Sequence, residues 1–190
     1  MSSRGKLFIV SAPAGSGKTT LVEMLCNERK DCVRSVSCTT RAVRGREIDG
    51  IDYFFLSPEE FEKKSLAGEF LEEAKVYEDR YGTLKSFVEE RLTQGKHVFL
   101  VIDTQGALKL KGKVEAIWVF IVPPSIKVLR ERLIGRGTET AEDIEKRLAW
   151  ARSEMKKADE YDYTVVNDDL NTAFMRFKEI LNKCCADSTS

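Results

Sequence analysis

Apolar residues in this chain gather in short unbroken runs that are separated by amphipathic stretches. Four runs are rich in β-branched or aromatic residues and do not alternate with polar ones, which is typical of strands buried on both faces of a sheet. They cover residues 6–11, 97–102, 117–122 and 163–166. Helical periodicity is found at residues 18–28, 57–67, 84–94, 125–134, 141–157 and 170–184. Strands that alternate with helices predict an α/β fold with a central parallel sheet between two layers of helices.

Two intervals break this alternation. Residues 33–95 are rich in Arg, Gly, Asp and Tyr, with short strand candidates at 52–56 and 70–76, so we interpret this interval as an insertion on the core. Residues 130–152 are charged, have no strand pattern and contain Gly135 and Gly137, which suits a moving helical lid. The chain of 190 residues is therefore predicted to form one domain. Its predicted parts are a core (1–34, 95–126 and 159–190), an insertion (35–94) and a lid (127–158).

Composition excludes several classes of protein. The 31 Lys and Arg residues balance 31 Asp and Glu residues, so no overall positive field is present to hold a nucleic acid. No apolar run approaches the roughly 18 to 20 residues of a membrane span, and no signal-peptide pattern is present, so we expect no membrane association and a cytoplasmic location. Five cysteines without a C-x-x-C pair, and a single histidine, favour neither a disulfide framework nor a zinc site.

A glycine-rich segment joins the first predicted strand to the first predicted helix. Residues 12–19 read Ala-Pro-Ala-Gly-Ser-Gly-Lys-Thr and match most of the phosphate-loop pattern in the strand-to-helix context that it requires. Gly15 and Gly17 let backbone N–H groups face a phosphate, and Lys18 can reach the β- and γ-phosphates of a nucleotide. Thr19 is placed to hold Mg²⁺. The alternative is a chance glycine-rich turn.

An aspartate follows the second buried strand. Asp103 stands at the carboxyl end of residues 97–102, where a carboxylate near a magnesium nucleotide is expected in a parallel sheet. The alternative is that Asp103 only caps a helix over residues 105–109.

The insertion contains a second group of candidate binding residues. Arg41 and Arg44 stand three positions apart beside hydroxyl residues, and arginines with tyrosine hydroxyls can form a phosphate clamp. Tyr53 and Glu72 follow, and a carboxylate beside hydroxyls can bind the hydrogen-bonding edge of a base. The alternative is a solvated basic loop with ordinary core and surface tyrosines.

Several motifs taken together resemble guanylate kinase. They lie, in order along the chain, at residues 35–41, 52–53, 68–72, 81–83, 102–106, 135–139 and 166–169. The resemblance covers nearly the whole chain and is more specific than the phosphate loop, which many unrelated enzymes share. It implies a P-loop NTPase-like kinase of purine nucleotide metabolism that uses ATP and Mg²⁺ to phosphorylate GMP to GDP.

The resemblance also assigns roles to individual residues. It implies GMP binding by Ser37, Arg41, Arg44, Tyr53, Glu72, Tyr81, Thr83 and Asp103. It implies ATP binding by Ala12, Pro13, Ala14, Gly15, Ser16, Gly17, Lys18, Thr19, Thr20, Arg136 and Asn167. The residues that it implies act on the transferring phosphoryl group are Lys18, Arg132, Arg136 and Arg147, and the expected Mg²⁺ ligands are Thr19 and Asp103.

Two positions depart from the family's pattern. Ala12 replaces the first glycine of the phosphate loop, which is tolerable if the residue has ordinary strand dihedrals. Val101 stands where many family members have a second acidic residue, so metal affinity is the property that it puts in question. Two other functions remain open: a kinase of this fold acting on another monophosphate, and a non-catalytic guanylate kinase-like module that binds proteins.

Overall fold

Five parallel strands form the core sheet of the computed structural model, which describes residues 3–76, 78–135 and 140–186. The strands are β1 (Leu7–Ser11), β2 (Cys32–Arg34), β7 (His97–Val101), β8 (Ile117–Val122) and β9 (Tyr163–Val166), and their order across the sheet is β2-β7-β1-β8-β9. Every pair is parallel, so the predicted parallel sheet is confirmed. The edge strand β2 was not predicted from the sequence.

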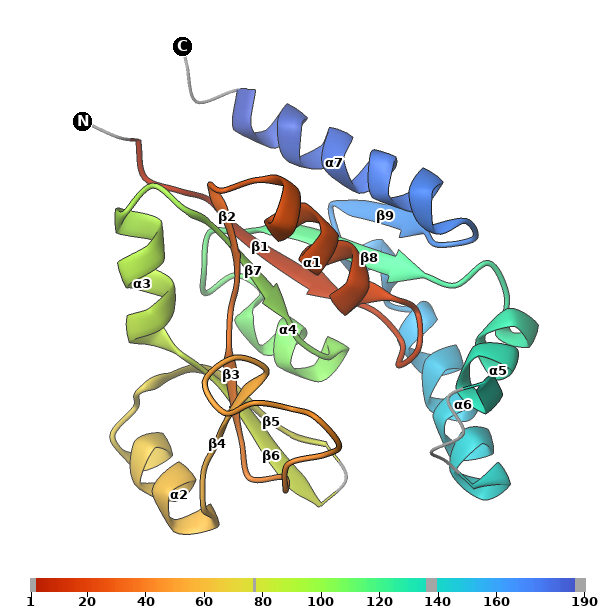
Figure 1. The fold of residues 1–190 in the computed structure, drawn as a ribbon, viewed down its shortest axis with the longest axis horizontal. Helices are drawn as coiled ribbons and strands as arrows, with labels where there is room; N and C mark the ends of the chain where they lie inside the picture. Colours follow the sequence, from red (N-terminus) through yellow and green to blue (C-terminus); the bar gives the residue numbers. More distant parts are fainter. Residues whose placement is uncertain (1–2, 77, 136–139, 187–190) are drawn as a thin grey trace.

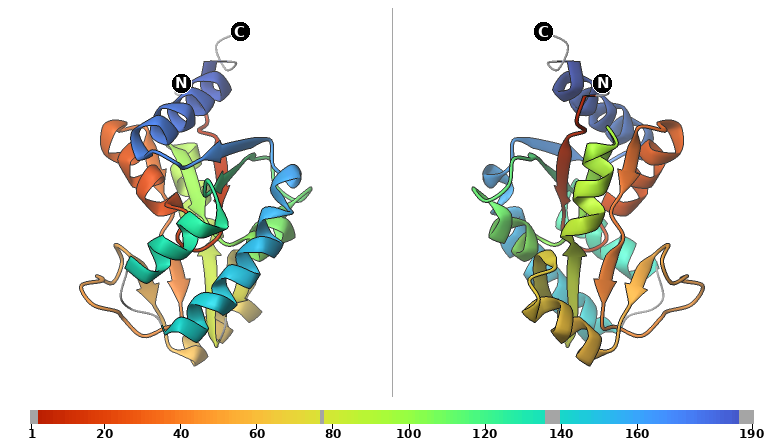
Figure 2. Two further views of the ribbon diagram at one scale, coloured as in Figure 1. Left: turned by 90° about the vertical axis from the view of Figure 1, so that its right-hand side faces the viewer. Right: turned by 90° about the vertical axis from the view of Figure 1, so that its left-hand side faces the viewer.

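Helices cover both faces of this sheet, as the sequence predicted (Figures 1 and 2). On one face, α1 (Lys18–Glu28) and α7 (Leu170–Ala186) contribute Leu21, Leu25 and Phe177 to a cluster that includes Phe8 and Phe99 of the sheet. The continuous apolar strands are explained by this arrangement, because each strand has a hydrophobic layer above and below it.

The opposite face is covered by α3 (Lys85–Thr93) and α4 (Thr104–Leu110). Val88 and Leu92 of α3 join Ile9 and Leu100 of the sheet in the second buried cluster. This packing attaches α3 to the core sheet, although the predicted boundary of the insertion at residue 94 includes it.

The insertion has a small sheet of its own, with the order β4-β3-β6-β5. Its strands are β3 (Ser37–Thr39), β4 (Tyr53–Phe55), β5 (Phe70–Val76) and β6 (Asp79–Leu84). The helix α2 (Pro58–Leu66) begins with a capping box in which Ser57 and Glu60 exchange hydrogen bonds. Phe61 of α2 packs on Phe70 of β5, which fixes the helix to the sheet.

Two helices make up most of the segment that the sequence predicts to be a lid. They are α5 (Ile126–Gly135) and α6 (Ala141–Met155), and they pack on each other through their own apolar cluster, which includes Leu133 and Leu148. Thr140 caps α6 by accepting a hydrogen bond from the backbone N–H of Asp143. A short 3-10 helix, η1 (Ala158–Glu160), leads from the lid to β9.

The insertion and the lid extend from the same end of the core (Figure 1). That end is where the parallel strands have their carboxyl termini and where the phosphate loop leaves β1. The predicted helices and strands agree with the observed ones to within one or two residues at most ends. No helix in the described part of the chain has the length and apolarity that a membrane span requires.

Candidate active site

The phosphate loop follows β1 and includes the first two residues of α1. Gly15 and Gly17 have backbone φ angles of 88° and 85°, which residues with a side chain rarely adopt. A Cβ atom at Gly17 would also lie 2.4 Å from Nδ2 of Asn167. That Asn167 amide donates a 2.8 Å hydrogen bond to the carbonyl of Ser16, so the loop is held by the end of β9.

The amino terminus of α1 is suited to an anion. Gly17 is the N-cap, no side chain caps the helix, and its first turn contains no acidic residue. The positive end of the helix dipole and its N–H groups are therefore not neutralised by a carboxylate of this helix. Nζ of Lys18 lies 3.5 Å from the carbonyl of Ala12, and Thr19 and Thr20 are exposed on the first turn. Ala12 itself is buried directly after β1, where its methyl group packs in the core cluster.

A cleft of about 410 Å³ runs from this helix terminus to the insertion. It is lined by eight of the predicted site residues: Lys18, Thr19, Ser37, Tyr53, Glu72, Tyr81, Asp103 and Arg147. These residues come from the core, the insertion and the lid, so the three parts of the fold share one site. Such a cleft can hold a donor phosphate at one end and an acceptor at the other.

Glu72 and Thr83 form a buried pair at the insertion end of the cleft. The Thr83 hydroxyl donates a 2.8 Å hydrogen bond to Oε1 of Glu72, whose side chain is 7% exposed. Burial raises the pKa of Glu72 to about 7, with the nearby Asp103 also raising it, although the Thr83 hydrogen bond acts in the opposite direction. The site therefore holds a carboxyl group that is costly to ionise until a ligand supplies hydrogen-bond donors.

Gly106 keeps the space beside this carboxyl group open. A Cβ atom at residue 106 would lie 2.7 Å from Oε2 of Glu72 and 3.2 Å from Oδ1 of Asp103. The glycine is therefore required by the close approach of α4 to the insertion.

Arg41 lies buried beside Tyr53 and Tyr81, as a phosphate clamp requires. Its guanidinium donates to the Tyr81 hydroxyl at 3.2 Å and to Oε1 of Glu47 at 2.8 Å, and it lies 5.3 Å from the centre of the Tyr53 ring. Burial acts to lower the pKa of Arg41, but the hydrogen bonds to Glu47 and Tyr81 outweigh it and raise that pKa. Arg44 is exposed, and its backbone N–H donates to Glu47. Glu47 thus organises both predicted arginines before any phosphate arrives.

Asp103 caps a helix, as the alternative interpretation of the sequence predicted, and it also lines the cleft. Its Oδ1 accepts a 2.7 Å hydrogen bond from the backbone N–H of Gly106, which caps α4. The carboxylate still faces the cleft that contains Thr19. No cluster of three or more His, Cys, Asp or Glu side chains suited to a metal is found within the described ranges. A site with one carboxylate and one hydroxyl fits Mg²⁺, which is usually held by one or two protein carboxylates together with substrate phosphates.

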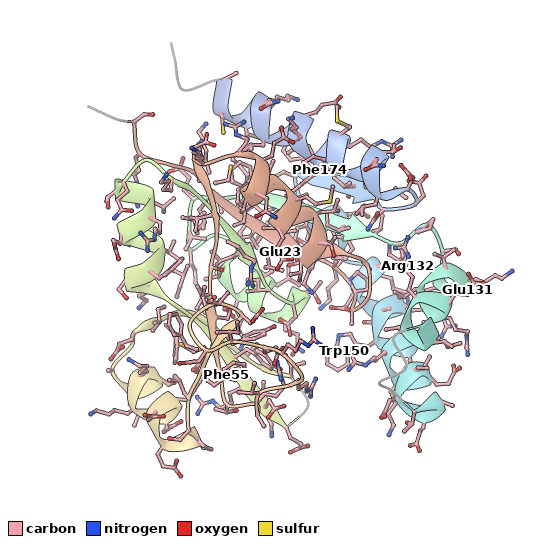
Figure 3. The ribbon with its side chains drawn as sticks, viewed as in Figure 1. Glu23, Phe55, Glu131, Arg132, Trp150 and Phe174 are labelled. Atoms are coloured by element: carbon pink, nitrogen blue, oxygen red, sulfur yellow. The ribbon has the colours of Figure 1, made fainter. Side chains whose placement is uncertain are left out.

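The predicted lid residues occupy different places. Arg147 lines the cleft, whereas Nη2 of Arg132 donates to the backbone carbonyl of Asn167 at 2.9 Å, at the base of the lid. Figure 3 labels Arg132 at that position. Arg136 lies outside the described residues.

Several residues that line the cleft were not predicted from the sequence. Arg34, Glu47 and Asp52 line the cleft, as does Glu23 of α1, which Figure 3 labels. Arg34 ends β2, and a prediction of that short strand would have placed it at the carboxyl edge of the sheet. The contacts of Glu47 with the two arginines have no counterpart in sequence spacing.

Comparison with known proteins identifies the family. The model of the guanylate kinase family matches residues 4–184. The chain belongs to the guanylate kinase family. The guanylate kinase of Protochlamydia amoebophila is 52% identical over 94% of this chain and 90% of its own length. The guanylate kinase of Thermotoga maritima is 47% identical over 90% of this chain and 83% of its own length.

Solved structures agree with this membership. The crystal structure of guanylate kinase from Anaplasma phagocytophilum matches with a TM-score of 0.78 and 33% identity, over 100% of this chain and 89% of the other. Shikimate kinase from Bacteroides thetaiotaomicron matches with a TM-score of 0.50 and 12% identity, which shows a shared fold and nothing about substrate. As a guanylate kinase, the chain is a nucleoside monophosphate kinase, a transferase with nucleotide substrates.

Proposed function

We propose that this guanylate kinase transfers the γ-phosphoryl group of ATP to GMP, giving ADP and GDP, and that it serves purine nucleotide metabolism in the cytoplasm. One observation carries the proposal: the buried carboxyl group of Glu72, which accepts a hydrogen bond from Thr83, lines the same cleft as Lys18 and Thr19 of the phosphate loop. A base can therefore be recognised at one end of the cleft while a nucleotide triphosphate is held at the other.

Glu72 selects guanine through the polarity of its hydrogen bonds. Guanine presents its N1–H and N2–H₂ donors to a carboxylate, whereas adenine would present the lone pair of its N1 atom. Adenine would leave the Glu72 carboxylate without donors at a site where this side chain is 7% exposed. Ser37 and Asp103, which line the same cleft, are the further groups that we assign to the guanine base.

The acceptor phosphate is assigned to Arg41, Arg44, Tyr53 and Tyr81. Arg41 is already fixed by Tyr81 and Glu47, so a phosphate meets a guanidinium that loses little side-chain entropy on binding. The phosphate of GMP is anionic at neutral pH and can attack without a general base. Alignment and charge neutralisation are therefore sufficient for the reaction.

The donor phosphates are assigned to the phosphate loop and the lid. The N–H groups of the loop and Lys18 hold the β- and γ-phosphates, while Arg147, with Arg132 and Arg136, neutralises charge on the transferring group. Asn167 supports the loop from β9 and lies where we expect the adenosine moiety to bind. Thr19 and Asp103 would hold Mg²⁺, which withdraws charge from the β- and γ-phosphate oxygens when it is bound.

A coupled assay tests the proposal. Purified protein with ATP and Mg²⁺ is offered GMP, AMP, CMP and UMP separately, and both nucleoside diphosphate products are quantified. We expect GDP formation with a kcat/KM for GMP at least about 10³-fold above that for the other three, because unpaired buried polar groups reject the wrong base. Preference for another monophosphate would make this chain a kinase of different specificity. No turnover with any of them would favour the protein-binding module.

A further inference from the structure

A smaller space of about 150 Å³ lies beside the main cleft, between the phosphate loop and the lid. Its walls include Lys18 and Asp103, to which we assigned roles toward the phosphates and Mg²⁺, and Val76 at the end of β5 in the insertion. The lid contributes Arg147, Trp150 and Glu154 of α6. A large apolar side chain, Trp150, thus stands among the charged groups that surround the site of transfer.

The spacing along α6 explains why these three side chains share a face. Residues 147, 150 and 154 follow the i, i+3, i+7 pattern and point to one side of the helix. Glu154 anchors this face to the core, since the Thr104 hydroxyl donates a 2.8 Å hydrogen bond to its Oε1. In Figure 3 the ring of Trp150 extends from α6 toward the middle of the molecule and away from α5.

Trp150 lies outside the buried cluster that the described residues of the lid form. That core is formed by Leu129, Leu133, Ile144, Leu148 and Ala151, with Ile126 packed against it. Trp150 instead remains 46% exposed on the face that lines the cavity. Among the described lid residues, the buried cluster therefore does not include Trp150, which faces the cavity instead.

We propose that Trp150 is a positioning residue that shields the transferring phosphoryl group from water. The inference rests on the proposed kinase activity. The indole of Trp150 from the lid and the side chain of Val76 from the insertion give this cavity apolar lining, and Lys18 lines the same cavity. An apolar wall cannot coordinate solvent, so it favours attack by the fixed GMP oxygen over attack by water. It also strengthens the nearby charge interactions, because it excludes a medium of high dielectric constant.

The two competing reactions have distinct products. In transfer, a phosphate oxygen of GMP forms a bond to the γ-phosphorus while the bond from that phosphorus to the β,γ-bridging oxygen breaks, which releases ADP and leaves GDP. In hydrolysis, a water oxygen forms the new bond, the same bridging bond breaks, and ADP, inorganic phosphate and a proton are released. The ratio of ADP to GDP therefore measures how much of the phosphoryl group is lost to water.

Three variants separate shielding from other roles. Trp150→Ala removes the apolar wall, and Trp150→Phe keeps an apolar ring but removes the indole N–H donor. The matched control is Ile134→Ala, because Ile134 is a large apolar residue of the lid that is 57% exposed and does not line the cavity. Thermal melting of all three variants identifies any loss of folding before kinetics are compared.

Product ratios decide the proposal. We expect about one ADP per GDP for the wild type and for Ile134→Ala, at least about threefold more ADP per GDP for Trp150→Ala, and a near-normal ratio for Trp150→Phe. An unchanged ratio in Trp150→Ala overturns the proposal. Equal defects in the Ala and Phe variants also overturn it, since they would assign the indole N–H as a hydrogen-bond donor to the phosphates. A wild type that makes no GDP would instead reject the proposed function.

Fluorescence gives a second measurement on the unmodified protein. Trp118 is 5% exposed in the core, so acrylamide quenching reports mainly on Trp150. We expect GMP together with a non-hydrolysable ATP analogue to reduce the quenching constant at least about twofold, because the shielded complex covers the indole. Quenching that does not change on formation of the ternary complex contradicts the proposal.

Discussion

Glu72 connects the pH of the medium to substrate binding. In the empty site burial raises the pKa of Glu72 to about 7, from an ordinary value of 4.5. Each pKa unit corresponds to about 1.4 kcal/mol, so ionising Glu72 in the folded, empty protein costs about 3 kcal/mol more than in the unfolded chain. Guanine's two donors favour the ionised carboxylate. GMP therefore has to select a form whose population falls from about nine-tenths at pH 8 to about one-tenth at pH 6.

The KM for GMP, measured at saturating ATP and constant free Mg²⁺, should rise about tenfold between pH 8 and pH 6 in the wild type. Glu72→Gln removes the titrating group and should lose about 2 kcal/mol of GMP binding free energy, so its KM for GMP at pH 8 should be near thirtyfold higher than that of the wild type. The KM of this variant should keep only the pH dependence that the GMP phosphate itself contributes. Parallel pH profiles for the two proteins would show that Glu72 does not titrate in this range or does not contact the base.

Unfolding measurements test the same pKa without substrate. Because the folded pKa of Glu72 lies above its unfolded value, its contribution to stability is complete below about pH 4.5 and is lost as the pH rises through about 7. The free energy of unfolding of Glu72→Gln, relative to the wild type, should therefore increase by up to about 3 kcal/mol between pH 4.5 and pH 8. A constant difference over that range would contradict the assigned shift.

Three further substitutions test other parts of the site. Lys18→Met should lower kcat by at least about 10²-fold, because it removes the positive charge that neutralises the transferring phosphoryl group. Its Tm should stay close to that of the control Lys63→Met, which lies on an exposed face of α2, and near-normal turnover would refute the role of Lys18. Gly106→Ala should raise the KM for GMP much more than that for ATP, because its Cβ would meet Oε2 of Glu72 at 2.7 Å, and equal changes in both KM values would argue against this contact as the cause. Asn167→Ala leaves the buried Ser16 carbonyl without its amide donor, so the free energy of unfolding in urea should fall by about 1 to 3 kcal/mol and ATP should bind more weakly. If neither value changes, Asn167 does not support the loop as we assign.

Much of the fold could be predicted because its strands are long apolar runs. The strand Ile117–Val122 and the helix Lys18–Glu28 were predicted with their observed bounds. The strands β2, β3 and β6 were missed, since the first two have three residues each and β6 contains Arg80, Gly82 and Thr83. Such segments become strands because they pair with a neighbouring strand, as β6 pairs with β5. The local pattern of hydrophobic residues does not predict that pairing.

Some residues of the site could likewise be predicted from the sequence, whereas others depend on the tertiary structure. The phosphate loop is contiguous in sequence, so its chemistry could be inferred from the residues themselves. The pairing of Glu72 with Thr83 depends on the register between β5 and β6, and the approach of Gly106 to Glu72 depends on how the insertion meets the core. Trp150 and Glu154 belong to the same category, because only the position of α6 brings them beside Lys18.

The hydrogen bond between Asn167 and Ser16 also bears on the order in which this protein matures. The phosphate loop is made well before the residue that supports it, because the supporting amide belongs to a residue 151 positions later in the chain. The neighbours of β1 in the sheet, β7 and β8, are likewise made long after it. A nascent chain that has not yet reached residue 167 therefore carries the complete nucleotide-binding motif without the contact that supports it. The phosphate loop gains this support only after β9 has been made and has joined the core sheet.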